Sequence, residues 1–167
     1  MRRILCLAVL LAGAPAAAET SQSFQVSARI ASGCVIATAA GGQWGTIDFG
    51  TVSGVAQGNV EANLASSAAA GISIECTPGI TASLSADTGG NAANGVRRLA
   101  TTGTGGTPIP YQLLLDNGAT VWTTQSVPLA FTPGATKRVL PIRGRALLAR
   151  PMAAGAYADT VRVTLSW

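Results

Sequence analysis

Few side chains in this sequence have the chemistry that catalysis requires. The chain contains no histidine, which removes the commonest general base and the usual zinc ligand. Its seven acidic residues are well separated along the chain, and no serine lies in a G-x-S-x-G or Ser-x-x-Lys motif. The glycine-rich residues 101–107, TTGTGGT, lack the GK[ST] ending of a phosphate-binding loop. We therefore predict that the protein is not an enzyme and binds no metal or cofactor.

The first eighteen residues have the organisation of a secretion signal. Arg2 and Arg3 precede a short apolar run, ILCLAVLLAGA, and three alanines at 16–18 offer a cleavage site. The apolar run is too short to span a bilayer comfortably, and no later segment resembles a membrane span. We expect an exported protein without a membrane segment after cleavage.

The cysteines that remain after cleavage form an even pair. Cys6 is lost with the signal, and Cys34 and Cys76 are left. In an exported protein such a pair indicates a disulfide, and two free buried thiols are the alternative. The bridge would close a loop of about forty residues, which the chain-entropy model values at roughly 4 kcal/mol.

The charge balance gives no sign of a nucleic-acid partner. Without Arg2 and Arg3 the mature chain carries nine basic residues against seven acidic ones, so the net charge falls from +4 to +2. The basic residues are scattered and lack interleaved aromatic residues. We interpret them as ordinary solvated positions.

Short alternating runs separated by turn residues indicate an all-β sandwich or barrel. Residues 62–71, ANLASSAAAG, are expected to be a loop leading into a strand, and Asp116-Asn117-Gly118 predicts a hairpin turn. The predicted strands are residues 24–31, 34–37, 46–49, 71–77, 80–86, 109–115, 120–122, 127–131, 137–143 and 156–167.

The first and last of these strands alternate in the same way. The apolar residues of the first are Phe24, Val26, Ala28 and Ile30. Those of the last are Val161, Val163, Leu165 and Trp167. No strand follows the last one to cover its edge, so a strand from another molecule is expected to add there, in a head-to-tail contact. Alternation alone favours the other reading, in which residues 24–30 pair within their own domain.

Four segments resemble the spore coat U domain family, which includes Csu-type pilins of the archaic chaperone–usher pathway. They are ARIASGCVI, GTIDFGTVSG, ISIEC and AGAYADTVRVTLSW. The family's motif residues fall here on Gly33, Phe49, Gly50, Tyr157 and Asp159.

This resemblance implies an incomplete immunoglobulin-like β-sandwich that lacks its last strand and is completed by a donor strand. It assigns residues 1–18 to the signal peptide, 19–31 to a donor-strand extension and 32–167 to the pilin domain. By the same resemblance Phe24, Val26, Ala28 and Ile30 are the donor residues. Val161, Val163, Leu165 and Trp167 would line one wall of the acceptor groove. Tyr157 and Asp159 match the family's corner before the last strand, and we expect them to have a structural, hydrogen-bonding role.

The function that the resemblance implies is that of a structural subunit of a surface pilus used in adhesion and biofilm formation. Its partners would be a periplasmic chaperone, an outer-membrane usher and other pilin subunits. The protein would be exported through the periplasm to the cell surface. The alternative is a monomeric secreted coat-like or surface-binding protein, in which residues 24–30 fold back onto their own domain.

Overall fold

The computed structural model describes residues 20–37, 42–66, 71–101, 103, 106–149 and 151–167. The expected signal peptide, residues 1–18, lies outside the described residues. Nearly all regular structure is β, which confirms the predicted fold class. The strands are β1 (Cys34–Ile36), β2 (Thr46–Ile47), β3 (Gly58–Ala65), β4 (Ile72–Cys76), β5 (Thr81–Ala86), β6 (Arg97–Thr101), β7 (Ile109–Leu115), β8 (Thr120–Trp122), β9 (Val127–Ala130), β10 (Lys137–Leu140), β11 (Arg143–Leu148), β12 (Tyr157–Ala158) and β13 (Val163–Ser166). One 3₁₀ turn, η2 (Asp116–Gly118), joins β7 to β8.

The chain divides into two units, Met1–Ile30 and Ala31–Trp167. In the first unit the described residues 20–30 form no strand, although residues 24–31 were predicted to be one. A strand is defined by a ladder with a second backbone, so an alternating sequence by itself does not make one. Within the described residues no helix is long and apolar enough to cross a membrane.

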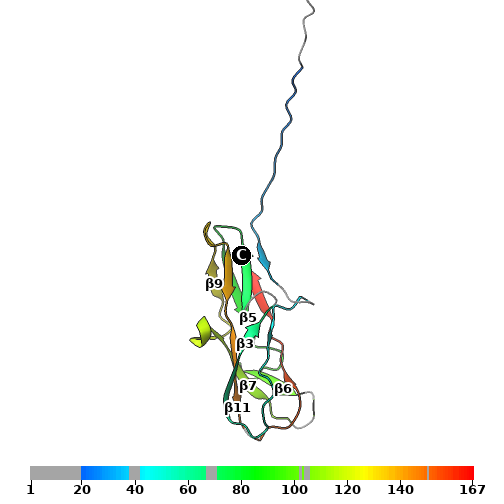
Figure 1. Ribbon diagram of the computed structural model, residues 1–167, viewed down its shortest axis with the longest axis vertical. Helices are drawn as coiled ribbons and strands as arrows, with labels where there is room; N and C mark the ends of the chain where they lie inside the picture. The colour runs from blue at the N-terminus through cyan, green and yellow to red at the C-terminus, as the bar shows by residue number, and fades with distance from the viewer. Residues whose placement is uncertain (1–19, 38–41, 67–70, 102, 104–105, 150) are drawn as a thin grey trace, which may run out of the picture. The chain divides into compact units, whose positions relative to one another are not determined.

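The described residues of the second unit form three hydrogen-bonded sheets, and Figure 1 shows how their strands are arranged. The largest has the order β12-β6-β7-β11-β3-β2, with β8 added to β7. The two smaller sheets have the orders β1-β4-β10 and β13-β5-β9. In Figure 1 the red β13 lies beside the green β5, its antiparallel partner. In the described residues β13 therefore has a ladder on one edge only.

A single hydrophobic core joins the three sheets. Each sheet contributes buried or half-buried apolar residues to this core, and β5 buries Ala82, Leu84 and Ala86 at every second position. The largest fully buried side chains of this core are Trp122, Phe131, Ile72, Ile74 and Leu84. This continuity means that the two small sheets and the large sheet fold as one domain.

Two of the predicted strands run across a boundary between strands of different sheets. Residues 137–143 cover β10 and only Arg143 of β11, and the two strands are separated at Pro141, which has no backbone N–H to donate to a ladder. Residues 156–167 divide into β12 and β13, and residues 159–162 cross between the sheets. The sequence pattern continues through both crossings, so alternation alone did not reveal them.

Three strands were missed: β3, β6 and all of β11 except Arg143. β3 includes residues 62–65, which were predicted to be loop, because alanine and asparagine are poor strand formers. β6 places the charged Arg97 at an inward position, where a strand pattern requires an apolar residue.

The predicted hairpin at Asp116-Asn117-Gly118 is present: Asn117 has a φ of 58° and Gly118 one of 101°.

The structure contains the Cys34–Cys76 disulfide predicted from the sequence. The two residues are paired in adjacent strands, β1 and β4. Next to the bridge, Thr77 donates its hydroxyl and its backbone N–H to the Gly33 carbonyl, at 3.2 and 2.9 Å. The Gly33 N–H donates in turn to the Thr77 hydroxyl at 3.1 Å. The start of β1 is therefore fixed covalently and by hydrogen bonds.

Reduction of the bridge should lower the stability of the mature protein by roughly 2–5 kcal/mol, because the unfolded chain regains its loop entropy. The measurement is urea unfolding with and without a reductant. The double variant Cys34→Ser/Cys76→Ser is the control, and its midpoint should not respond to the reductant. Equal midpoints for the oxidised and reduced wild-type protein would show that the bridge adds no stability.

Candidate functional site

A cavity of ≈ 540 Å³ lies in the second unit. One wall is formed by residues 42–47 and Phe49, and the opposite wall by residues 159–163. The floor between them consists mainly of apolar side chains, including Leu64, Ile72, Leu113, Trp122 and Ile142. We call this cavity the groove.

The first wall is held by packing against a glycine. β2 pairs with β3 over only two residues, after which Phe49 turns toward β11. A Cβ on Gly144 of β11 would lie 2.7 Å from the Phe49 ring and 2.8 Å from the Ile47 Cγ2 atom. Gly144 thus leaves the space that Ile47 and Phe49 occupy.

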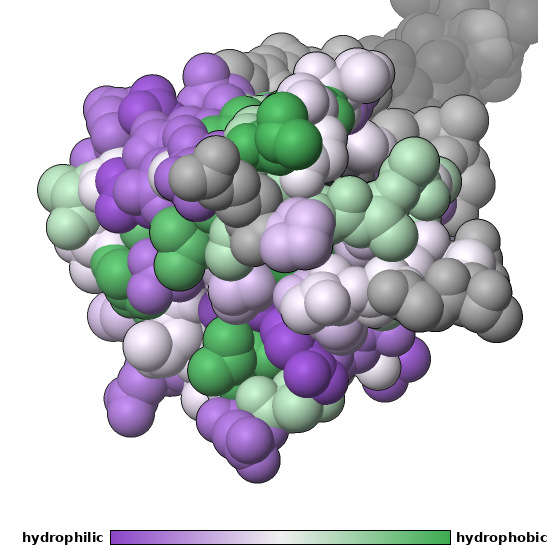
Figure 2. All heavy atoms as spheres, turned by 90° about the horizontal axis from the view of Figure 1, so that it is seen from below, coloured by the Kyte–Doolittle hydropathy of each residue, from purple (hydrophilic) through white to green (hydrophobic). Residues whose placement is uncertain are grey.

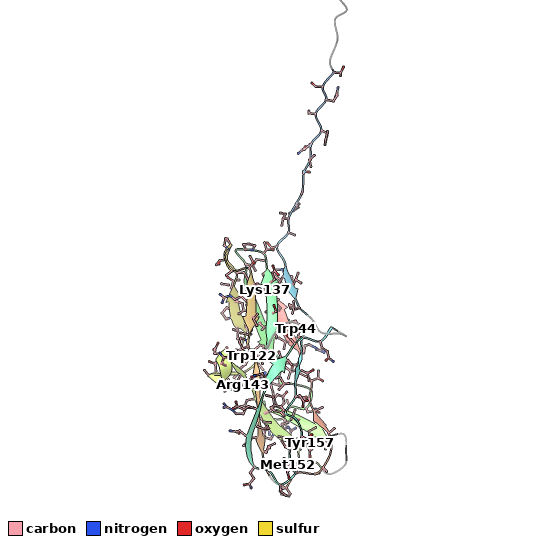
Figure 3. All side chains as sticks on the ribbon, viewed as in Figure 1. Trp44, Trp122, Lys137, Arg143, Met152 and Tyr157 are labelled. Carbon is pink, nitrogen blue, oxygen red and sulfur yellow. A yellow bond between two sulfur atoms is a disulfide. The ribbon has the colours of Figure 1, made fainter. Side chains whose placement is uncertain are left out.

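The motif around Phe49 fixes the turn that follows it. The Gly50 N–H donates to the Asp48 carboxylate at 2.8 Å, and Gly50 has a φ of 72°. That conformation favours glycine, which explains why this residue type follows Phe49. Trp44 completes the wall, and Figure 3 shows it in the middle of the domain together with Trp122 of the floor.

The second wall is held by hydrogen bonds to carboxylates. The Asp159 carboxylate accepts from the Tyr111 hydroxyl at 2.7 Å, and from the Asn91 backbone and side-chain nitrogens at 3.0 and 3.1 Å. The Asp87 carboxylate accepts from the Arg162 N–H at 2.9 Å. Burial, together with the hydrogen bond to Asp159, raises the pKa of Tyr111 above its ordinary value, so this hydroxyl remains a donor.

Arg97 is a buried cation, 7% exposed, that bonds to backbone carbonyls. Its Nε and Nη2 atoms donate to the Asp87 carbonyl at 2.9 and 2.7 Å, and its Nη1 atom donates to the Trp122 carbonyl at 2.6 Å. Burial lowers the pKa of the guanidinium. Arg97 therefore links the segment that holds the second wall to the floor of the groove.

The predicted site residues are placed as follows. Val161 and Val163 line the groove, Leu165 packs against the core without lining it, and Trp167 is 60% exposed. In the first unit Phe24, Val26 and Ile30 are 86, 83 and 89% exposed, and Ala28 is also exposed.

The motif residues near the end of the chain make different contacts. Asp159 lies at the groove, whereas the Tyr157 hydroxyl donates to the Ala153 carbonyl at 3.0 Å. Figure 3 shows Tyr157 near Met152, toward one end of the domain.

Sequence reasoning missed several residues that build the groove. They are Trp44, Asp87, Asn91, Arg97, Tyr111 and Gly144. For Gly144 a signal existed, since it is a glycine at an inward position of an alternating run, RGRALL. The polar residues act through contacts between positions that are distant in the sequence, which no local pattern reveals. The hydrogen bond between Tyr111 and Asp159, for example, joins residues 48 positions apart.

Outside the groove, the surface mixes polar and apolar side chains. Figure 2 shows hydrophobic residues in separate groups between hydrophilic ones on the face that it displays. Glu61 forms ion pairs with Arg145 and Arg143, and its hydrogen bonds to these two residues lower the pKa of its carboxylate.

Among the described residues, no three His, Cys, Asp or Glu side chains are placed to hold a metal ion.

Residues 20–164 match the model of the Spore Coat Protein U domain family. The chain belongs to this family. The match covers both walls of the groove and the residues predicted to be donors. It ends within β13, so Leu165, Ser166 and Trp167 lie outside it. No curated protein sequence matches the chain.

A solved structure of a pilus subunit complex shares the fold of this spore coat U domain. A chain of the CsuC–CsuE chaperone–tip adhesion subunit pre-assembly complex from the archaic chaperone–usher Csu pili of Acinetobacter baumannii aligns with a TM-score of 0.55 and 17% identity. The alignment covers 83% of this chain and 40% of that chain, so the present chain spans less than half of its length. The P pilus rod subunit PapA aligns with a TM-score of 0.49 and 17% identity over 80% of this chain and 97% of PapA. The spore coat U domain described here has the immunoglobulin-like β-sandwich fold that the family resemblance implied.

Replacing Gly144 by alanine should displace Ile47 and Phe49 from the first wall, because the added methyl group has no room. We expect a loss of about 1–3 kcal/mol in the free energy of unfolding, measured with urea. Gly134→Ala is the matched control, since a Cβ there meets no atom within 4 Å. If the two variants were equally stable, the packing of Phe49 over Gly144 would not hold the wall.

Proposed function

We propose that the protein is a structural subunit of a surface pilus assembled by the chaperone–usher route. In this proposal residues 24–30 of one copy fill the groove of the next copy, so that subunits join head to tail. The observation that carries the proposal is an apolar groove of ≈ 540 Å³ beside a strand, β13, that has a ladder on one edge only among the described residues.

The groove offers what an added strand needs. The edge of β13 without a ladder in the described residues presents backbone N–H and C=O groups, and the floor presents mainly apolar side chains. A strand laid there gains main-chain hydrogen bonds on one side and buries every second side chain. The site therefore selects an extended segment with apolar residues at alternate positions.

Residues 24–30 have that pattern and are exposed. Phe24, Val26 and Ile30 are large apolar residues two or four positions apart. Burying such side chains contributes roughly 1.5–3 kcal/mol each. Since the donor and the groove are at different places on the same chain, each added copy brings a new donor, and the contact propagates.

The same chemistry implies partners. An apolar groove beside an unpaired strand edge is an aggregation hazard before assembly. A periplasmic chaperone would cover it during transit, and an outer-membrane usher would exchange the chaperone for the next subunit. Such a fibre would serve adhesion and biofilm formation at the cell surface.

Two variants test the head-to-tail contact. Val26→Asp disables the donor and leaves the groove intact, whereas Val163→Asp disables the groove and leaves the donor intact, because an unpaired charge is costly in an apolar site. Each variant of the mature chain should remain monomeric when refolded alone. Their mixture should form dimers and nothing longer, as seen on an unheated denaturing gel, whereas the wild-type chain should give a ladder.

Val55→Asp is the control, since Val55 is an exposed valine outside the groove lining, and this variant should polymerise like the wild type. A wild-type chain that remains monomeric, and that unfolds when residues 19–31 are deleted, would contradict the proposal. That result would favour a monomeric coat-like or surface-binding protein that fills its own groove.

A further inference from the structure

The segment between β12 and β13 forms the second wall of the groove but belongs to no sheet. Residues 159–162 leave the large sheet after Ala158 and enter the β13-β5-β9 sheet at Val163. The side chain of Val161 nevertheless lines the groove. Something other than a strand ladder must therefore set the position of this wall.

Polar contacts replace the ladder along the whole segment. At its start, the Asp159 carboxylate accepts from Tyr111 and Asn91. In the middle, the Thr160 carbonyl accepts from the Gly90 N–H at 3.1 Å. At its end, Arg162 donates its N–H to the Asp87 carboxylate and accepts from the Asp87 N–H, both at 2.9 Å.

These contacts are attached to a rigid part of the molecule. Tyr111 lies in β7, at the centre of the large sheet, and is itself buried. Asp87 is held by Arg97, which also holds the Trp122 carbonyl. The wall is thus tied to the floor of the groove through groups that do not depend on what fills the groove.

We infer that Tyr111, Asn91 and Asp159 are positioning residues that keep the groove open before a donor strand arrives. The apolar side chains on the two walls, which include Ile47 and Val161, gain free energy if they come together out of water. Hydrogen bonds that hold one wall to the frame oppose this closure, so the site is preorganised for capture. After capture the ladder between donor and β13 holds the wall, and the polar contacts matter less. This inference rests on the proposed function.

The test measures capture and release separately. The acceptor is the full mature chain carrying Val26→Asp, and the probe is a fluorescent peptide of residues 20–31, TSQSFQVSARIA. Tyr111→Phe removes one hydroxyl from the wall contact and keeps the ring, while Asn91→Ala removes two side-chain hydrogen bonds at a turn. Each should slow peptide association about tenfold, the equivalent of losing one hydrogen bond to a charged group, and leave dissociation within about twofold.

The matched control is Glu61→Gln, which also removes charged hydrogen bonds from the large sheet but lies outside the groove lining. It should leave both rates unchanged. If Tyr111→Phe and Asn91→Ala lower the melting temperature but leave the association rate unchanged, the contacts are merely structural and the inference is wrong. If the acceptor with no further substitution does not bind the peptide at all, the proposed function fails, and this inference fails with it.

Discussion

An edge strand beside an apolar groove needs a partner, and most of the features of this protein relate to that need. β13 pairs with β5 on one edge, has no ladder on the other edge in the described residues, and contributes Val163 to the groove lining. A further strand there would satisfy the backbone and cover the floor in one step. An exposed strand edge beside apolar side chains is also prone to aggregation. In the proposed function the same groove is therefore both the assembly site and a hazard until a strand fills it.

The two walls of the groove are held by different physical means. The first depends on shape, because Phe49 and Ile47 occupy the space left by Gly144. The second depends on polar contacts, because Asp159 and Asp87 anchor a segment that has no ladder of its own. Packing is non-directional, whereas hydrogen bonds fix distance and angle. The wall without a ladder is therefore the one that requires directional contacts.

Much of the fold could be predicted from the sequence because strand alternation is a local signal. Residues 71–77 and 109–115 were recognised as strands, and β4 and β7 lie there. β6 was not recognised, because Arg97 points inward and is satisfied by carbonyls that lie 10 to 26 residues away. The crossing at 159–162 was also missed, since its hydrogen-bond partners are distant in sequence. Val161 and Val163 were assigned to the groove from alternation and family resemblance, whereas Leu165 and Trp167, assigned in the same way, lie outside its lining.

The most direct measurement asks whether the strand in the groove comes from another molecule. The assembled protein would be prepared from a mixture of subunits labelled only with ¹⁵N and subunits labelled only with ¹³C, and examined by solid-state NMR. The account predicts ¹⁵N–¹³C cross-peaks between residues 24–30 of one chain and Val161 and Val163 of another. If contacts between these segments appear in uniformly double-labelled protein but not in the mixture, each chain fills its own groove, and head-to-tail assembly through this strand is contradicted.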